Sequence, residues 1–267
     1  MTWAGLNVFL DLQCMLFATN RAQFQQFFID NESTIQLLIQ RLYSLPVPYS
    51  TQRSVTVDTY TASRLHPAML EALTPVRTTG NGDCLWNGIS NCLCGSERYT
   101  YSLRLLTAYG LIKFKERMVA QLCVQYLGDT AGADRRWSDL LRIAITPTAW
   151  GTDFHVYVIS VVLNIPIFMF TSFVCEQDRV PSYYIDPSLD LIQLSSYFRS
   201  HGERCTAHQL HCSEEHVQSL LNEPYERWIR DPICMFFHID HFVGLMYTTE
   251  SHKQQIPVPY SRWYREH

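Results

Sequence analysis

The stretch TTGNGDCLWNGIS, residues 78–90, joins a turn-forming sequence directly to a helix-forming one. The two glycines of the turn, Gly80 and Gly82, allow backbone conformations that other residues avoid. From Cys84 onward, apolar residues recur at the 3.6-residue period of an amphipathic helix, which Gly95 is expected to end. The sequence therefore predicts a tight turn followed by a helix whose first residue is a cysteine.

Cys84, at this helix start, is a candidate nucleophile. The unpaired N–H groups of a first helical turn and the helix dipole stabilise negative charge, so the position favours the reactive thiolate. The preceding glycines also let loop N–H groups converge on a developing oxyanion, as acyl transfer requires. The competing interpretation is a buried core thiol, because cysteine is among the most buried residue types. Position alone does not decide between the two.

A nucleophilic cysteine needs a base, most often a histidine that the fold brings near. His241 is the best placed of the ten histidines, because it opens a hydrophobic strand-like run late in the chain. A rigid strand there can hold the imidazole against the helix start. His238 is its nearest rival. Cys84 and His241 are therefore a candidate catalytic pair, and the competing interpretation is a core thiol and a satisfied polar histidine at a strand end.

The remaining pattern contains many helices and few strands. Helices are predicted over residues 7–28, 32–45, 65–73, 101–126 with a break near Gly110, 133–145, and 153–163, the last capped by Thr152. Strand-like runs cover 165–170, 233–237 and 241–247. Only His238-Ile-Asp240 separates the last two runs, which suits adjacent antiparallel strands.

Composition excludes several classes of protein. The 267 residues are 47% hydrophobic and carry a net charge of -4 without a strong basic cluster, so nucleic acid is not an expected partner. No run reaches the roughly 18 apolar residues of a membrane span. Nine cysteines show no disulfide framework, and no secretory leader pattern opens the chain. We expect a soluble, monomeric protein of the cytoplasm or nucleus with reduced thiols.

Three segments together resemble the ovarian-tumour (OTU) family of cysteine proteases. GNGDCLWNGIS (80–90) resembles the family's cysteine box, DGNCLF followed by a helix. WGTDFHVYVISVVLNIPIFMF (150–170) resembles its WGGE helix and the strand beginning Pro-Ile, and HFVGL (241–245) resembles the HYxxL strand that supplies its histidine. The three occur in the family's order. The sequence around the cysteine looks closest to the vertnin-like, transposon-associated branch.

The resemblance implies an α+β, papain-like OTU fold with a small central β-sheet sandwiched between helices. The resembling segments span residues 78–247, and from the helical pattern of the first 60 residues we assign 1–60 to a helical N-terminal extension packed on or preceding the core and 61–267 to the OTU-like catalytic domain. The implied activity is deubiquitination, the hydrolysis of (iso)peptide bonds at the C-terminus of ubiquitin or a ubiquitin-like protein. The implied partner is ubiquitin or a polyubiquitin chain, and no cofactor or metal is needed.

The same resemblance assigns roles in the site. Cys84 is the nucleophile and His241 its general base, and the backbone N–H groups of Gly82, Asp83 and Cys84 form the oxyanion hole. An alternative is an OTU-like domain that has lost catalysis and serves as a ubiquitin-binding or protein-interaction module. Retention of both the cysteine and the histidine favours the enzyme.

The third member of the site departs from the family. Many members carry Asn or Asp two residues after the histidine to orient the imidazole, but Val243 stands there. Asn81 is the first candidate for the missing role, since an amide oxygen accepts a hydrogen bond from imidazole in papain-like triads. Asp58, Asp153 and Asp240 are the other candidates, and a dyad without a third member stays open. The departure favours the inactive alternative.

Three secondary features have competing interpretations. The cluster of zinc-capable residues in 205–216 (Cys205, His208, His211, Cys212 and His216) fits a metal site less well than a solvated helix, because its spacing matches no known finger. Trp86 is expected to pack in the core, with a place in the channel for ubiquitin's tail as the alternative. Gly244 is expected to let the substrate chain approach the site.

Overall fold

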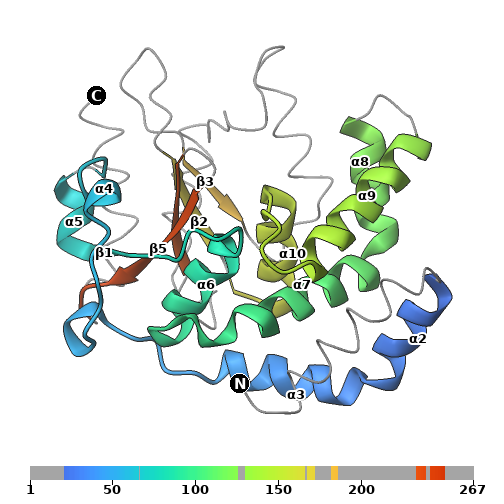
Figure 1. The fold of residues 1–267 in the computed structure, drawn as a ribbon, viewed down its shortest axis with the longest axis horizontal. Helices are drawn as coiled ribbons and strands as arrows, with labels where there is room; N and C mark the ends of the chain where they lie inside the picture. The colour runs from blue at the N-terminus through green and yellow to red at the C-terminus, as the bar shows by residue number, and fades with distance from the viewer. Residues whose placement is uncertain are drawn as a thin grey trace, which may run out of the picture.

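The part of the chain that the structure describes forms one five-stranded mixed sheet with helices on both of its faces (Figure 1). The structure is a computed structural model that describes residues 21–65, 67–125, 130–165, 167–171, 182–185, 233–238 and 241–249. This is an α+β fold, as predicted. No helix within these ranges is long and apolar enough to cross a membrane.

The helices, in chain order, are α2 (Arg21–Asp30), α3 (Glu32–Tyr43), α4 (Thr59–Ala62), α5 (Pro67–Ala72), α6 (Cys84–Cys94), α7 (Thr100–Lys113), α8 (Lys115–Gln125), α9 (Thr130–Ile145) and α10 (Asp153–Leu163). Two 3₁₀ turns are η1 (Ser50–Gln52) and η2 (Glu97–Tyr99). The strands are β1 (Leu73–Val76), β2 (Ile167–Thr171), β3 (Ser182–Ile185), β4 (Ile233–His238) and β5 (His241–Tyr247).

The sheet has the strand order β1-β5-β4-β2-β3. Strands β2 and β4 pair in parallel, and every other pair is antiparallel. The predicted pairing of the two late strands is confirmed, and its register places His238 opposite His241 at the end of the ladder. The structure thus fixes the predicted base at the beginning of a central strand.

Alternating residues of the central strands face two hydrophobic clusters, as strand geometry requires. Met235 and Phe242 join the larger cluster, which lies under α6, α7 and α10. Phe236 and Val243 point the other way, into a smaller cluster with Leu65 and other residues that precede β1. In Figure 1, α6 to α10 accordingly lie on one side of the sheet, and α4 and α5 on the other.

Helix α6 lies directly on β5 because glycines remove the side chains between them. A Cβ on Gly244 would lie 2.6 Å from the carbonyl oxygen of Gly88, and one on Gly88 would lie 2.6 Å from Cε of Met235. The prediction that Gly244 makes room for substrate is therefore wrong, since α6 fills that space. The contact instead sets the distance between α6 and β5.

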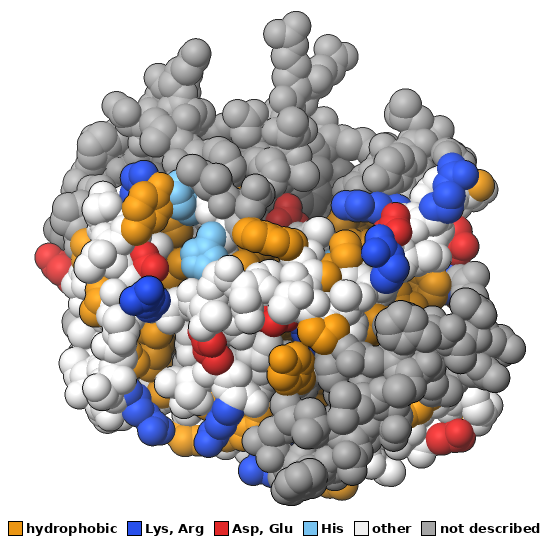
Figure 2. All heavy atoms as spheres, in the orientation of Figure 1, with side chains coloured by type: hydrophobic (Ala, Val, Ile, Leu, Met, Phe, Trp, Pro, Cys, Tyr) orange, Lys and Arg blue, Asp and Glu red, His pale blue; other side chains and the backbone are white. Residues whose placement is uncertain are grey.

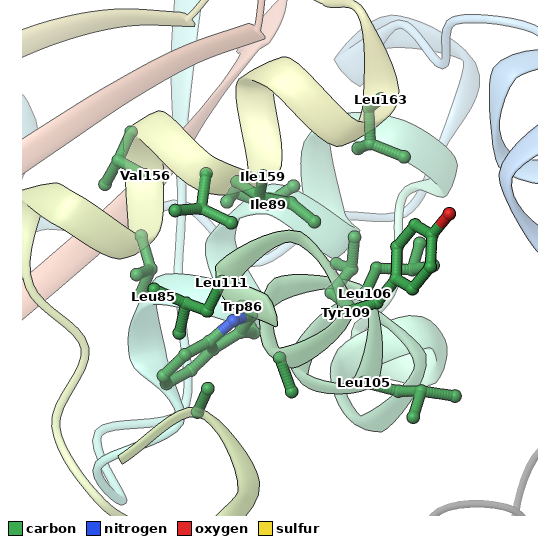
Figure 3. Close-up of a cluster of buried hydrophobic side chains, with 14 of the residues drawn as sticks. Leu85, Trp86, Ile89, Leu105, Leu106, Tyr109, Leu111, Val156, Ile159 and Leu163 are labelled. Carbon is green, nitrogen blue, oxygen red and sulfur yellow. The ribbon is translucent and has the colours of Figure 1, made fainter. Parts of the chain in front are cut away.

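Helices α6, α7 and α10 share a core of large side chains, among them Trp86, Leu106 and Ile159 (Figure 3). The predicted break near Gly110 is wrong, because α7 continues to Lys113 and the chain breaks at Phe114 instead. A Cβ on Gly110 would lie 2.5 Å from Val158 and from Val162. This glycine therefore lets α10 approach α7 rather than ending the helix.

Helix α3 packs onto this core. Ile35 and Leu42 are fully buried in the larger cluster, and Gln36 donates a hydrogen bond to the Tyr109 hydroxyl at 3.2 Å. Part of the segment expected to be an extension, residues 1–60, is thus continuous with the core. The domain boundary at 60/61 stays a prediction.

Strand β1 was not predicted, because the helix expected over 65–73 ends one residue early and Pro75 follows. Proline cannot donate to a sheet ladder and is confined to edges. β1 is such an edge, since it pairs with β5 alone within the sheet, with Pro75 opposite Leu245. Proline here marks an edge strand rather than a loop.

Candidate functional site

Cys84 is the first residue of α6, as predicted, and its side chain is fully buried. Burial raises the pKa of its thiol above the ordinary value. Hydrogen bonds from the backbone of Phe242, Leu85 and Cys84 itself act in the opposite direction, and the charge of Asp83 raises the pKa further. The contact with Phe242 places the sulfur at the start of β5.

His241 is the first residue of β5 and is half-buried. Its imidazole lies beside the turn before the cysteine, since a Cβ on Gly80 would be 3.6 Å from its Cε1 and 3.8 Å from its Nδ1. The fold therefore brings Cys84 and His241, far apart in sequence, to the same corner. On the face shown in Figure 2, histidine side chains reach the surface beside hydrophobic ones.

The two groups are neutral at rest. Burial lowers the pKa of His241, and the charge of Asp58 partly offsets this by raising it. Because the pKa of Cys84 is raised, its thiol is protonated and uncharged near pH 7. Because the pKa of His241 is lowered, its imidazole is unprotonated and also uncharged there. A proton must then pass from sulfur to imidazole during attack, which is general-base chemistry.

Asn81, the first candidate for the third member, is exposed and has other partners. Its Oδ1 accepts hydrogen bonds from the backbone N–H of Asp83 at 3.2 Å and from Nδ2 of Asn87 at 3.5 Å. Nδ2 of Asn87 also donates to the carbonyl oxygen of Thr79. The Asn81 oxygen therefore closes its own turn, and it occupies one N–H group assigned to the oxyanion hole.

Asp58 is the candidate acid whose charge reaches the imidazole. It caps α4, its carboxylate accepting from the Thr61 N–H at 2.7 Å, and its own N–H donates to the Pro75 carbonyl oxygen at 3.0 Å. Its charge raises the pKa of both His241 and His238. Sequence reasoning named Asp58 but could not favour it, because only the pairing of β1 with β5 brings it near.

Two candidates for the third member remain. Asp153 opens α10, whose N-cap is Thr152 as predicted. Asp240 is outside the described residues, as is the zinc-capable cluster 205–216. The described residues contain no group of three His, Cys, Asp or Glu side chains arranged to hold a metal.

Gly82 is a residue that the fold requires to be glycine. Its φ of +83° lies in the left-handed region, and a Cβ there would be 1.8 Å from the carbonyl oxygen of Thr148. The turn before Cys84 is thus pressed against the segment that follows α9. This contact sets the direction of the backbone entering α6.

A buried arginine lies behind the nucleophile, and sequence reasoning missed it. Arg104, on α7, has no exposed surface and forms an ion pair with Asp83. Its guanidinium stacks 3.6 Å from the centre of the Trp86 ring, whose Nε1 donates to Thr107. Trp86 is fully buried, which confirms the core interpretation. A lone arginine among apolar residues in SLRLLTA was the available signal.

His155 is the second buried polar residue that sequence reasoning missed. Its Nδ1 accepts from the Thr152 N–H and its Nε2 donates to the Leu140 carbonyl oxygen, each at 2.9 Å. Burial lowers its pKa to about 4, so the ring stays neutral. This histidine joins α9 to the start of α10 and has a structural role.

One segment of this chain matches a known protein family. Residues 75–129, which contain the turn, the cysteine and Arg104, match the family described as "Vertnin, OTU domain". This segment of the chain is OTU-like. No curated protein matches it in sequence.

Solved structures of OTU domains are distantly similar. This chain is 13% identical to the OTU domain of OTUD1, with a TM-score of 0.43, covering 70% of this chain and 93% of that one. The viral OTU protease of Dera Ghazi Khan virus is 15% identical, with a TM-score of 0.39 and coverage of 67% and 84%. The Hazara virus OTU bound to ubiquitin is 13% identical, with a TM-score of 0.34 and coverage of 68% and 85%.

Proposed function

We propose that this OTU-like protein is a cysteine hydrolase that cleaves (iso)peptide bonds at the C-terminus of ubiquitin or a ubiquitin-like protein. The observation that carries the proposal is the convergence of Cys84 at the start of α6 and His241 at the start of β5. The match to an OTU family supports the substrate class.

In the proposed reaction, neutral His241 takes the proton of Cys84 as the sulfur attacks the carbonyl carbon of the scissile bond. Loop N–H groups stabilise the resulting oxyanion. The imidazolium then gives its proton to the departing amine, leaving a thioester. A water molecule, deprotonated by His241, hydrolyses the thioester and frees the thiol.

Substrate must open the resting site. Cys84 has no exposed surface, and the N–H of Asp83 is bonded to Asn81. Asn81 is exposed, so it is free to swing outward without unpacking the core. We propose that the substrate carbonyl replaces the Asn81 oxygen as the acceptor of the Asp83 N–H. Ubiquitin binding and assembly of the oxyanion hole would then be the same event.

A second candidate function is favoured by the same burial. A thiol with no exposed surface and a raised pKa, in a chain that has Val243 where many family members have an orienting acid, suits a ubiquitin-binding module without catalysis. Such a module would bind ubiquitin and form no covalent product. The two candidates therefore differ in one observable, the bond to sulfur.

The deciding experiment is incubation with ubiquitin that carries a cysteine-reactive group at its C-terminus. The hydrolase forms a covalent adduct at Cys84, located by mass spectrometry, and Cys84→Ala forms none. Cys94→Ala is the matched control, because Cys94 ends the same helix and is also buried. No adduct, with reversible ubiquitin binding intact, would establish the binding module.

Asp58→Asn is expected to move the acid limb of the pH profile to lower pH. The charge of Asp58 raises the pKa of His241, so its removal lowers that pKa, and the imidazole stays neutral and active at lower pH. Asparagine caps a helix as well as aspartate does, so α4 should persist. The measurement is the rate of adduct formation against pH.

Asp139→Asn is the control for this change, because Asp139 is a surface carboxylate on α9 paired with Arg142. It is expected to leave the acid limb in place. If the two variants gave the same profile, Asp58 would have no electrostatic role at the imidazole.

A further inference from the structure

The carboxylate of Asp83 joins two segments that are far apart in sequence. Its Oδ1 accepts from Nε of Arg104 at 2.6 Å and from the backbone N–H of Thr148 at 3.1 Å. Asp83 is 2% exposed and immediately precedes Cys84. The residue before the nucleophile is therefore held by α7 and by the segment after α9.

Arg104 extends the same connection. Nη1 donates to the carbonyl oxygen of Ile143 at 2.8 Å, and Nη2 donates to that of Ala149 at 2.7 Å and to that of Gly82 at 3.4 Å. A planar guanidinium is suited to such a set of acceptors, which an ammonium group could not reach together. One side chain thus contacts the loop before Cys84 and both ends of the 143–149 segment.

The held segment is strained where it meets the loop. Thr148 has a φ of 60°, an unusual value for a β-branched residue. Its carbonyl oxygen occupies the space next to Gly82 where a Cβ would lie. Strain of this kind persists only where the surroundings enforce it, and here Asp83 bonds the Thr148 N–H while Arg104 bonds Ala149.

We propose that Asp83 and Arg104 are positioning residues, which hold the loop of Gly82, Asp83 and Cys84 against the 143–149 segment and set the electrostatic environment of the thiol. This rests on the proposed function in so far as the loop serves an oxyanion. The two side chains touch no reacting atom and act through the backbone and through charge.

The charge effect has a definite sign. Two charged groups interact with the Cys84 thiol, Asp83 next to it in sequence and Arg104 from α7, while the His241 imidazole from β5 lies beside Gly80 in the preceding turn. The charge of Asp83 disfavours the thiolate, whereas Arg104 and the thiolate attract each other. Removing the acid should therefore promote the thiolate, and removing the arginine should suppress it.

The test is alkylation of Cys84 by iodoacetamide in the folded full chain, followed by mass spectrometry of the Cys84 peptide. Asp83→Asn keeps an acceptor oxygen and removes the charge. It is expected to speed alkylation at pH 8 by about three-fold or more, because only the thiolate reacts. Arg104→Gln is expected to slow alkylation by a similar factor, and the double variant to lie between the two single ones.

Opposite shifts separate positioning from mere stability. If the pair only held the fold, either change would loosen the loop, expose the thiol and speed alkylation in both variants. Shifts in the same direction, or no shift, would overturn the proposal. Since this assay contains no ubiquitin, opposite shifts without a ubiquitin adduct would reject the hydrolase and keep the electrostatic role of the pair.

A charge-conserving variant covers the case in which a single variant does not fold, as judged by thermal unfolding. Arg104→Lys retains the positive charge but cannot bond all the acceptors. It is expected to alkylate within about two-fold of the parent while forming the ubiquitin adduct at least ten-fold more slowly. An unchanged adduct rate in this variant would overturn the positioning role.

Discussion

His241→Gln is expected to slow adduct formation with the ubiquitin electrophile by about 10²- to 10⁴-fold, the usual contribution of a general base. The size of the effect follows from the resting state. Because burial leaves the Cys84 thiol protonated, attack depends on a neighbouring base, and the fold places His241 there. The rate constant should be measured above pH 7, where the imidazole of the parent protein is neutral.

His238→Gln is the matched control. His238 lies opposite His241 in the strand register, is also partly exposed, and responds to the same Asp58. Its ring packs 4.5 Å from that of Tyr60 and its pKa is lowered, so it carries no charge above pH 7. We expect less than about a three-fold change in rate. A larger loss in His238→Gln than in His241→Gln would identify His238 as the base.

Gly82→Ala is expected to lower the free energy of unfolding by roughly 3 kcal/mol, the sum of a left-handed conformation and an overpacked contact. The added Cβ would meet the Thr148 carbonyl oxygen at 1.8 Å, and backbone cannot move aside as a flexible side chain can. Both segments would have to shift, so adduct formation should be lost with stability. Urea unfolding measures the first effect and the ubiquitin electrophile the second.

Gly80→Ala tests whether any added methyl group in this turn has the same effect. A Cβ on Gly80 would make only ordinary contacts, at 3.6 Å or more from His241, and Gly80 is exposed. Its φ lies outside the left-handed region, since Gly82 and Gly95 are the described glycines with positive values. We expect a change in unfolding free energy within about 0.5 kcal/mol. A loss equal to that of Gly82→Ala would remove the conformational explanation.

Local sequence signals predicted the elements that carry the site. The period of α6, its end at Gly95, the cap at Thr152 and the antiparallel pairing of β4 and β5 all depend on residues close together in the chain. Such signals can be recognised directly from the spacing and type of neighbouring residues. They made Cys84 and His241 candidates, and the resemblance to the OTU family favoured them as a pair.

The missed features depend on distant contacts. Gly110 looks like a helix break in sequence but serves the approach of α10, and Pro75 looks like a loop residue but lies in an edge strand. The partners of Arg104 come from three separate segments, and Asp58 reaches His241 only after β1 pairs with β5. No spacing rule encodes these contacts, because tertiary packing decides them.

The glycine contact between α6 and β5 has a consequence for how the protein opens. Since no side chain separates Gly88 from Gly244, neither element can move far without breaking the interface that holds the other. Amide hydrogens of the helix and the strand should therefore exchange with solvent in one cooperative event. Cys84 and His241 therefore belong to a single cooperative unfolding unit. Partial unfolding that displaces one of them also displaces the other.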